Sequence, residues 1–204
     1  MARTTGSDGA KTEAAIREAA VALIARRGFE GVSMRRLAEE VGVQAGALYR
    51  YFPTKQALLA SMMRAHMRHL IGSWRAAKPE GAGPVEALEA FARFHVRYHI
   101  DRRDEVFINY MELRSLDPEN AAEIKALRKE YERELREILS AGRAAGLFSA
   151  PDVAVAAMAL IAMLTGVTTW RKPGGRLAPG EIEAVYVALA LCAVGAAAPA
   201  PAEA

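Results

Sequence analysis

Residues 33–52 read SMRRLAEEVGVQAGALYRYF, and this stretch decides the fold. Ser33 is a residue type that caps helix N-termini, and Gly42 supplies the positive φ that a tight turn between two helices needs. The small Ala38 lets the two helices cross closely, and Leu48 is placed to pack between them. The stretch therefore predicts a helix-turn-helix.

The outer face of the second helix carries side chains that suit contact with DNA, namely Gln44, Tyr49, Arg50 and Tyr51. Arg35 and Lys55 flank this face at the starts of the adjoining helices, where backbone N–H groups also favour a phosphate. A rigid helix of this kind fits the major groove of DNA. The alternative is an ordinary helical corner with surface aromatics, but an arginine set among aromatic residues favours DNA binding.

Charge is distributed unevenly along the chain. Residues 1–78 hold 13 Lys and Arg against 6 Asp and Glu, whereas residues 79–204 hold 14 against 18. A basic front end on an acidic body is typical of a nucleic-acid-binding head, although chance clustering would give the same balance. The single cysteine, Cys192, excludes a disulfide framework and a Cys-rich zinc module. The polar N-terminus lacks a secretory signal, so a cytoplasmic location is expected.

Almost every other segment has helical periodicity, and Gly and Pro fall between the periodic segments. An all-α fold is therefore predicted, with helices at 12–27, 33–41, 44–52, 54–74, 85–100, 104–116, 119–145, 152–170 and 180–194. The predicted domains are residues 1–55, which include a short disordered N-terminal arm, and residues 56–204.

The helices at 152–170 and 180–194 are apolar on nearly all sides. A transmembrane helix needs about 20 strongly apolar residues, and the segment 153–167 is shorter, rich in alanine and without flanking aromatic belts. A helix that is apolar all round is otherwise buried in a core or against another subunit. We therefore expect a homodimer built on these two helices and no membrane contact.

Four stretches at the front of the chain form a specific combination: GF at 28–29, VSMRRLA at 32–38, VGV at 41–43 and GALYRYFPTK at 46–55. Together they resemble the N-terminal domain of TetR-family transcriptional regulators. The resemblance implies an N-terminal three-helix helix-turn-helix domain joined to a six-helix ligand-binding and dimerisation domain. It also implies a regulator rather than an enzyme, with a double-stranded DNA operator, a small-molecule effector and a second copy of the chain as partners.

The same resemblance assigns roles to single residues. It places phosphate contacts at Tyr49, Tyr51 and Lys55, and base-edge contacts at Arg35, Ala45 and Gly46, with Gln44 near the start of the reading helix. Many members have lysine where this chain has Ala45 and threonine where it has Ala47, so two polar contacts are missing. Base reading is therefore expected to depend more on Arg35, Gln44 and Arg50.

Candidate effector-binding residues are the aromatic, methionine and arginine side chains of the later helices: Phe94, Tyr98, Phe107, Tyr110, Met111, Arg114, Tyr131 and Met163. Core packing is the alternative for each aromatic residue and methionine. Arg114 lies in a segment predicted to be mostly apolar, so it is expected to need a partner, either Glu112, Asp117 or a ligand anion.

The segments 104–116 and 170–177 resemble a TetR subgroup that senses acyl-CoA thioesters. Trp170, Arg171 and Arg176, with Lys172 and the backbone at 174–175, would hold the phosphates of coenzyme A. Gly166 stands where some members have a second tryptophan, so one stacking platform is absent. A solvated basic turn is the alternative for this segment, and a different hydrophobic small molecule is the alternative effector.

No catalytic grouping or cofactor motif is found in the sequence. His95 and His99 have a spacing that can bind metal, but no third ligand accompanies them, so hydrogen-bonded or exposed histidines are expected and no metal. The function predicted is a ligand-responsive DNA-binding regulator, a repressor released from a palindromic operator by its effector. The alternative is an all-helical ligand carrier without DNA binding.

Overall fold

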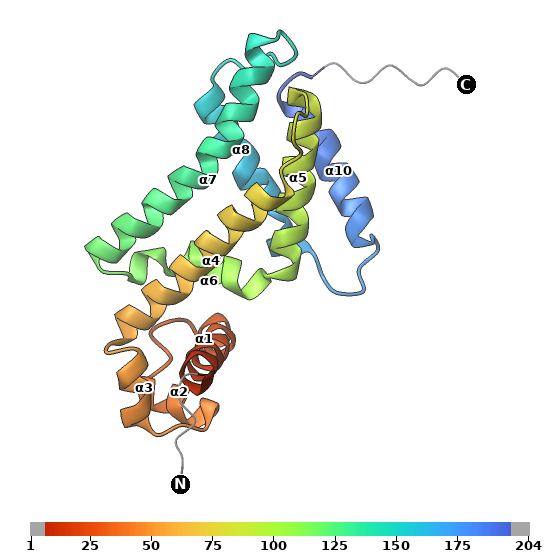
Figure 1. Cartoon of the computed structure of the whole chain (residues 1–204). Helices are drawn as coiled ribbons and strands as arrows, with labels where there is room; N and C mark the ends of the chain where they lie inside the picture. The colour runs from red at the N-terminus through yellow and green to blue at the C-terminus, as the bar shows by residue number, and fades with distance from the viewer. Residues whose placement is uncertain (1–6, 197–204) are drawn as a thin grey trace. The chain divides into compact units, whose positions relative to one another are not determined.

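The computed structural model describes residues 7–196, and no strand occurs within that range. Figure 1 shows the order of the helices along the chain. The elements are α1 (Ser7–Arg27), α2 (Met34–Val41), α3 (Ala45–Tyr51), α4 (Lys55–Ala77), α5 (Pro84–Asp101), α6 (Arg103–Met111), the 3-10 helix η1 (Glu112–Ser115), α7 (Pro118–Ala144), α8 (Val153–Thr165), α9 (Val167–Trp170) and α10 (Pro179–Ala193). The all-α prediction is confirmed, whereas the predicted disordered arm lies mostly outside the described residues.

Two of the predicted helices are interrupted. The segment 104–116 leaves the α-helical path after Met111 and tightens into η1. Pro118 disfavours helical backbone at Asp117, so the segment does not continue as a helix into α7. The segment 152–170 is divided at Gly166, whose N–H is shared between the carbonyl oxygens of Ala162 and Met163. Glycine is a poor helix former, which makes it the natural place for that break.

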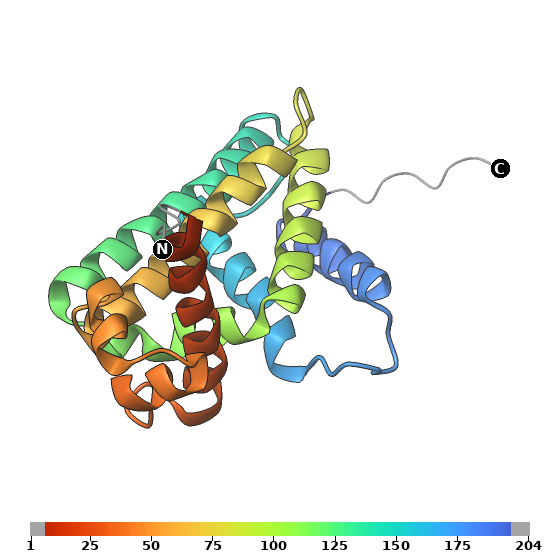
Figure 2. The ribbon, with the colours of Figure 1, turned by 60° about the horizontal axis from the view of Figure 1, so that its bottom comes forward.

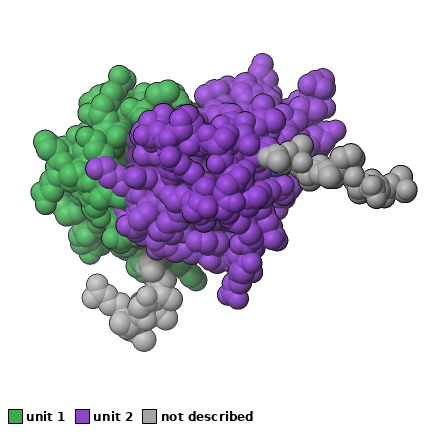
Figure 3. Space-filling model, turned by 90° about the horizontal axis from the view of Figure 1, so that it is seen from above, with its two compact units in different colours: residues 1–68, 104–126 green, residues 69–103, 127–204 purple. Residues whose placement is uncertain are grey.

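The described residues fall into two compact units, coloured separately in Figure 3. Unit 1 comprises residues up to Arg68 together with Asp104–Ala126, so α6, η1 and the start of α7 pack with the front of the chain. The predicted domain boundary between residues 55 and 56 separates a DNA-binding domain from a ligand-binding and dimerisation domain, and it stays a prediction. The core of unit 1 contains an apolar stripe of α1: Ile16, Ala20, Leu23 and Ile24 are all buried.

Unit 2 comprises His69–Arg103 and the residues from Leu127 onward. Its central helix is α5, which packs along α10 and also contacts α8 and α9 (Figures 1 and 2). The core of unit 2 is aromatic and aliphatic, with Trp74 of α4, Phe91 of α5, Tyr131 of α7 and Leu164 of α8 almost fully buried. Every fourth or third residue of α5 contributes to this core, which is the pattern of an amphipathic helix with a wide apolar face.

The outer sides of α8 and α10 remain apolar and open to solvent in the single chain. Val155, Met158, Val185 and Leu189 are each about half exposed. The segment Val153–Trp170 has the length and hydropathy of a membrane span; 28% of it is buried, and it consists of two helices, α8 and α9.

Candidate functional site

The predicted helix-turn-helix is formed by α2 and α3. The Ser33 hydroxyl oxygen accepts the Arg36 N–H at 3.2 Å and so caps α2, and Gly42 ends the helix with a φ of 73°. The Val43 N–H then donates to the Ala38 carbonyl at 2.9 Å, which closes the turn. Ala38 and Leu48 are buried between the helices as expected, so the turn and the crossing are both set by local sequence.

The predicted DNA-contacting residues of α2, α3 and the residue before α3 are exposed or half-buried. Arg35, Gln44, Gly46, Tyr49 and Arg50 are exposed, whereas Ala45 and Tyr51 are half-buried. A Cβ atom built on Gly46 would meet nothing within 4 Å, so the start of α3 is open to a close approach from outside. The Arg35 guanidinium pairs with the Glu39 carboxylate at 3.3 Å, but both side chains are largely exposed, so the pair is weak.

Lys55 begins α4, and the preceding Thr54 caps this helix by accepting the Ala57 N–H at 2.9 Å. The Lys55 ammonium lies 4.0 Å from the centre of the Phe29 ring and 4.0 Å from a carboxylate oxygen of Glu30. Its position is therefore fixed from two sides, and its charge is available at the surface because the side chain is only partly buried.

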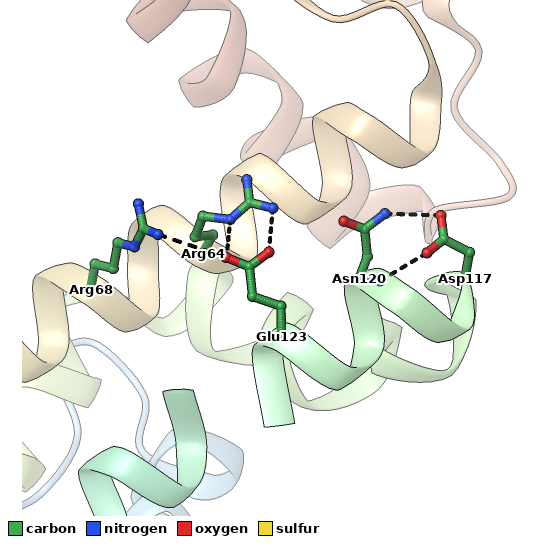
Figure 4. Close-up of polar contacts among 5 residues, drawn as sticks. All are labelled: Arg64, Arg68, Asp117, Asn120 and Glu123. Atoms are coloured by element: carbon green, nitrogen blue, oxygen red, sulfur yellow. Dashed lines mark hydrogen bonds and ion pairs between the residues drawn. The ribbon is translucent and has the colours of Figure 1, made fainter. Parts of the chain in front are cut away.

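Within unit 1, α4 is bound to α7 by an ion-pair cluster shown in Figure 4. The Arg64 guanidinium donates two hydrogen bonds of 2.6 Å to the Glu123 carboxylate, and Arg68 lies 3.7 Å from the same carboxylate. The hydrogen bonds from Arg64 lower the pKa of Glu123. At the start of α7, Asp117 accepts both the backbone and the side-chain N–H of Asn120. The Arg64–Glu123 pair has no local signal in the sequence, because its partners are 59 residues apart.

Each of the four histidines makes a hydrogen bond, and the described residues contain no cluster of three metal-ligating side chains. His95 is buried, with Nδ1 3.1 Å from the Tyr131 hydroxyl and Nε2 3.0 Å from the Thr165 hydroxyl. Its ring stacks on His99 at 3.7 Å. Burial, and secondarily the charge of His99, lowers the pKa of His95 well below its ordinary value of 6.5. The neutral imidazole is thus a structural link between α5, α7 and α8.

Four of the candidate effector-binding residues lie in unit 1, on α6 and η1. Phe107, Tyr110 and Met111 are exposed on one side of α6, and Arg114 is exposed on η1. Arg114 was expected to need a partner because it stood in an apolar helix. Since it lies on an exposed 3-10 turn, water can solvate its charge, and that reason for a ligand anion disappears.

The other candidates lie in unit 2. Tyr98 and Tyr131 are buried, and their hydroxyl groups are bonded to His69 and His95, respectively. The Phe94 ring lies between those of Trp74 and Tyr98, at 5.5 and 5.6 Å, and Met163 is half-buried. Each of these side chains contributes to packing. The Trp74 Nε1–H is buried with no hydrogen-bond partner among the described residues.

The loop between α9 and α10 borders two hollows, and Arg171 lines both of them. One hollow of about 200 Å³ is lined by Trp170, Arg171, Lys172, Gly175, Arg176, Leu177 and Ile182. A second, of about 150 Å³, is lined by Ile100, Arg103, Val167, Thr168, Arg171 and Pro173. The predicted Trp170, Arg171 and Arg176 are therefore brought together, and Arg103 is an addition from a distant helix.

Electrostatics make this loop suited to an anion. The two hollows are lined by four cationic side chains and by no carboxylate. The Arg171 Nε is buried and has no hydrogen-bond partner in the described part of the chain, which is costly for a charged donor. Trp170 is held in place because its Nε1–H donates to the Tyr186 hydroxyl at 3.0 Å and its ring stacks on that of Tyr186.

Two family models match the chain. Residues 16–62 match the model of bacterial regulatory proteins of the tetR family, and residues 81–194 match the model of the tetracyclin repressor-like C-terminal domain. Among curated proteins, the chain is similar to the HTH-type transcriptional repressor KstR2 of Mycolicibacterium smegmatis, with 28% identity over 94% of each chain.

Solved structures show the same likeness over nearly the whole chain. A regulatory protein in the tetR family from Rhodococcus RHA1 superposes with a TM-score of 0.87 at 30% identity, covering 92% of this chain and 99% of the other. AibR in complex with isovaleryl coenzyme A and operator DNA superposes with a TM-score of 0.81 at 31% identity, covering 87% and 97%.

Proposed function

Because the chain belongs to the tetR family of bacterial regulatory proteins, we propose that it is a dimeric repressor whose operator affinity is lowered by an acyl-CoA thioester. As a DNA-binding regulator it acts in the cytoplasm, where the operator is. The observation that carries the effector class is the cationic, carboxylate-free loop around Arg171 with its unpartnered buried Nε.

In this proposal α3 enters the major groove. Tyr49, Tyr51 and Lys55 contact the phosphates, which position the helix and provide the salt-dependent part of the affinity. Arg35, Gln44 and Arg50 are exposed and long enough to reach base edges, whereas Ala45 and Gly46 let the helix approach closely. Each good bidentate base contact discriminates by about 1–3 kcal/mol.

The apolar outer sides of α8 and α10 form the dimer interface in this proposal, and no membrane is involved. Val155, Met158, Val185 and Leu189 are 46–57% exposed in the single chain, and pairing with a second copy buries them. Two-fold pairing presents two α3 helices, so a near-palindromic operator with half-sites about 34–36 Å apart is expected.

The effector acts by linkage. If it binds the dimer more tightly when the two helix-turn-helix heads are displaced from the operator spacing, it lowers the DNA affinity by the same factor. Helix α4 contributes residues to both units and is the proposed lever. The structure of AibR with isovaleryl coenzyme A and operator DNA supports the thioester class over other hydrophobic molecules.

Operator release tests the effector class. Duplexes selected from a random library by the full-length protein would be labelled, and fluorescence anisotropy would follow binding during titration with isovaleryl-CoA, a long-chain acyl-CoA, free coenzyme A and the free acids. We expect release by at least one thioester, with Arg171→Met and Arg176→Met weakening the response and Lys129→Met, an exposed cation elsewhere in unit 2, leaving it unchanged. If no thioester releases the duplex, the effector proposal is wrong and DNA binding is unaffected.

A further inference from the structure

The turn that follows α1 is tied to a segment far along the chain. Gly28 ends α1 with a φ of 72°, which leaves the next N–H, that of Phe29, outside the helix. This N–H donates to Oε1 of Glu112 in η1 at 2.9 Å, across 83 residues of sequence. The other carboxylate oxygen, Oε2, accepts the Ser115 hydroxyl at 2.7 Å, so both oxygens of Glu112 are used.

The Phe29 side chain carries this connection to α4. Its ring is 3% exposed, and the Lys55 ammonium lies over it at 4.0 Å. A cation above an aromatic ring is attracted by the negative face of the ring, so the ring sets where the ammonium rests. Glu112 thus fixes the Phe29 backbone, and the Phe29 ring, together with the Glu30 carboxylate beside it, sets the position of the Lys55 ammonium.

A second link joins the start of α4 to residues 115–117, through Gln56, the residue that follows Lys55. The Gln56 side chain donates to the Ser115 carbonyl at 2.6 Å and accepts the Asp117 N–H at 3.2 Å. The first turn of α4 is therefore held by η1 through Phe29 on one side and through Gln56 on the other. All of these contacts lie within unit 1.

We propose that Glu112 is a positioning residue for DNA binding: through Phe29 it holds the Lys55 ammonium where it contacts a backbone phosphate of the operator. The inference deepens the proposed function and rests on the proposed phosphate contact of Lys55. It assigns to η1 a part in operator affinity although none of its residues is proposed to touch DNA.

The salt dependence of operator affinity separates this role from general stability. The logarithm of the binding constant falls with the logarithm of the salt concentration by about 0.9 for each neutralised phosphate. We expect Lys55→Met and Glu112→Met each to reduce this slope by about 0.9 per head, and the double variant to reduce it no further. A purely structural loss would lower the amount of active protein or its melting temperature without changing the slope.

The matched control is Glu112→Gln, which removes the same charge but keeps an oxygen that can accept the Phe29 N–H. It is expected to keep the wild-type slope. A second variant, Phe29→Leu, removes the ring but keeps the backbone N–H, and it is expected to reduce the slope as Lys55→Met does. If Glu112→Met does not fold, Phe29→Leu still tests whether the position of Lys55 depends on Phe29.

The outcomes separate the two proposals. If Lys55→Met lowers the slope but Glu112→Met and Phe29→Leu do not, the positioning role is wrong and the phosphate contact stands. The role is also wrong if Glu112→Gln and Glu112→Met behave alike. If Lys55→Met itself leaves the slope unchanged, both the phosphate contact and the positioning role are wrong, while binding by α3 is unaffected.

Discussion

At the scale of single residues, a substitution of Gly46 is expected to have opposite effects on the stability of the fold and on operator affinity. It is a helical glycine with open space around its Cβ position, so Gly46→Ala is expected to stabilise the fold, by up to about 1 kcal/mol. The added methyl group stands where α3 approaches the bases, so operator affinity is expected to fall by about tenfold, within the 1–3 kcal/mol of one lost contact. Chemical denaturation and anisotropy measure the two effects.

The comparison variant is Gly42→Ala, at the turn before α3. Gly42 has a φ of 73°, and a side chain there costs about 1–2 kcal/mol although no neighbour is in the way. This variant should lose stability and, once folded, bind DNA normally. If Gly46→Ala binds the operator as tightly as the wild type, α3 does not approach the bases as we propose.

His95 makes the stability of the protein depend on pH. Its folded-state pKa is lowered, first by burial and then by the charge of His99. In mildly acidic solution the unfolded chain therefore binds a proton at His95 that the folded chain does not bind. This contribution to stability is therefore complete above about pH 6.5 and is lost as the pH falls toward the folded pKa, by about 1.4 kcal/mol per pH unit.

Unfolding free energies of the wild type and of His95→Gln, measured from pH 7.5 to 5, check this expectation. The variant should be less stable at pH 7.5, because it disturbs the bonds to Tyr131 and Thr165, but its stability should fall less on acidification. Parallel pH profiles for the two proteins would show that His95 titrates normally in the folded state.

At the scale of helices, the pairing of α5 with α10 contains a carboxylate that depends on one arginine. The Glu183 side chain is 3% exposed and accepts two hydrogen bonds from Arg97, of 2.9 and 2.7 Å. Arg97→Leu leaves this carboxylate buried without its partner. We expect a loss of about 2–3 kcal/mol, below the range for fully buried pairs because Arg97 itself is largely open to solvent.

Replacing both partners should recover most of that loss. The double variant Arg97→Leu with Glu183→Leu removes the buried charge together with its partner, so its unfolding free energy should exceed that of Arg97→Leu alone. Additive losses in the double-mutant cycle would contradict the assignment of Glu183 as a charge that depends on Arg97.

The helices also show which features of the structure could be predicted from the sequence and which could not. The helix-turn-helix followed from local signals, since Ser33 and Gly42 act on the backbone beside them. The burial of His95 could also have been found, because it continues the buried stripe of Phe91 and Ala92 on α5. Contacts such as that between Glu112 and Phe29 leave no local signal, because they depend on how distant helices pack.

The proposed effector site was only partly predictable for the same reason. The loop 170–177 is contiguous, so Trp170, Arg171 and Arg176 could be named together before the structure was known. Arg103 reaches the second hollow from another helix and was missed. The exposed aromatic residues of α6 were grouped with the buried ones of unit 2 because composition alone does not distinguish them.

At the scale of the whole molecule, dimerisation is expected to control DNA binding. Leu189→Glu places a charge on the apolar side of α10 and should convert the dimer into monomers, measured by analytical ultracentrifugation, with operator affinity reduced by at least tenfold. Leu147→Glu is the control, because Leu147 is similarly exposed but lies outside α8 and α10. A Leu189→Glu protein that stays dimeric would place the interface elsewhere.

The central claim is that two copies of α3 read the major groove of one symmetric duplex. Selection of binding sequences from a random duplex library by the full-length protein tests it most directly. We predict enrichment of a two-fold symmetric motif with half-sites about one helical turn or slightly more apart, and a changed half-site preference for Gln44→Ala. Recovery of no motif, or of the same motif by a variant with Gln44, Tyr49 and Arg50 all replaced by alanine, would contradict the account.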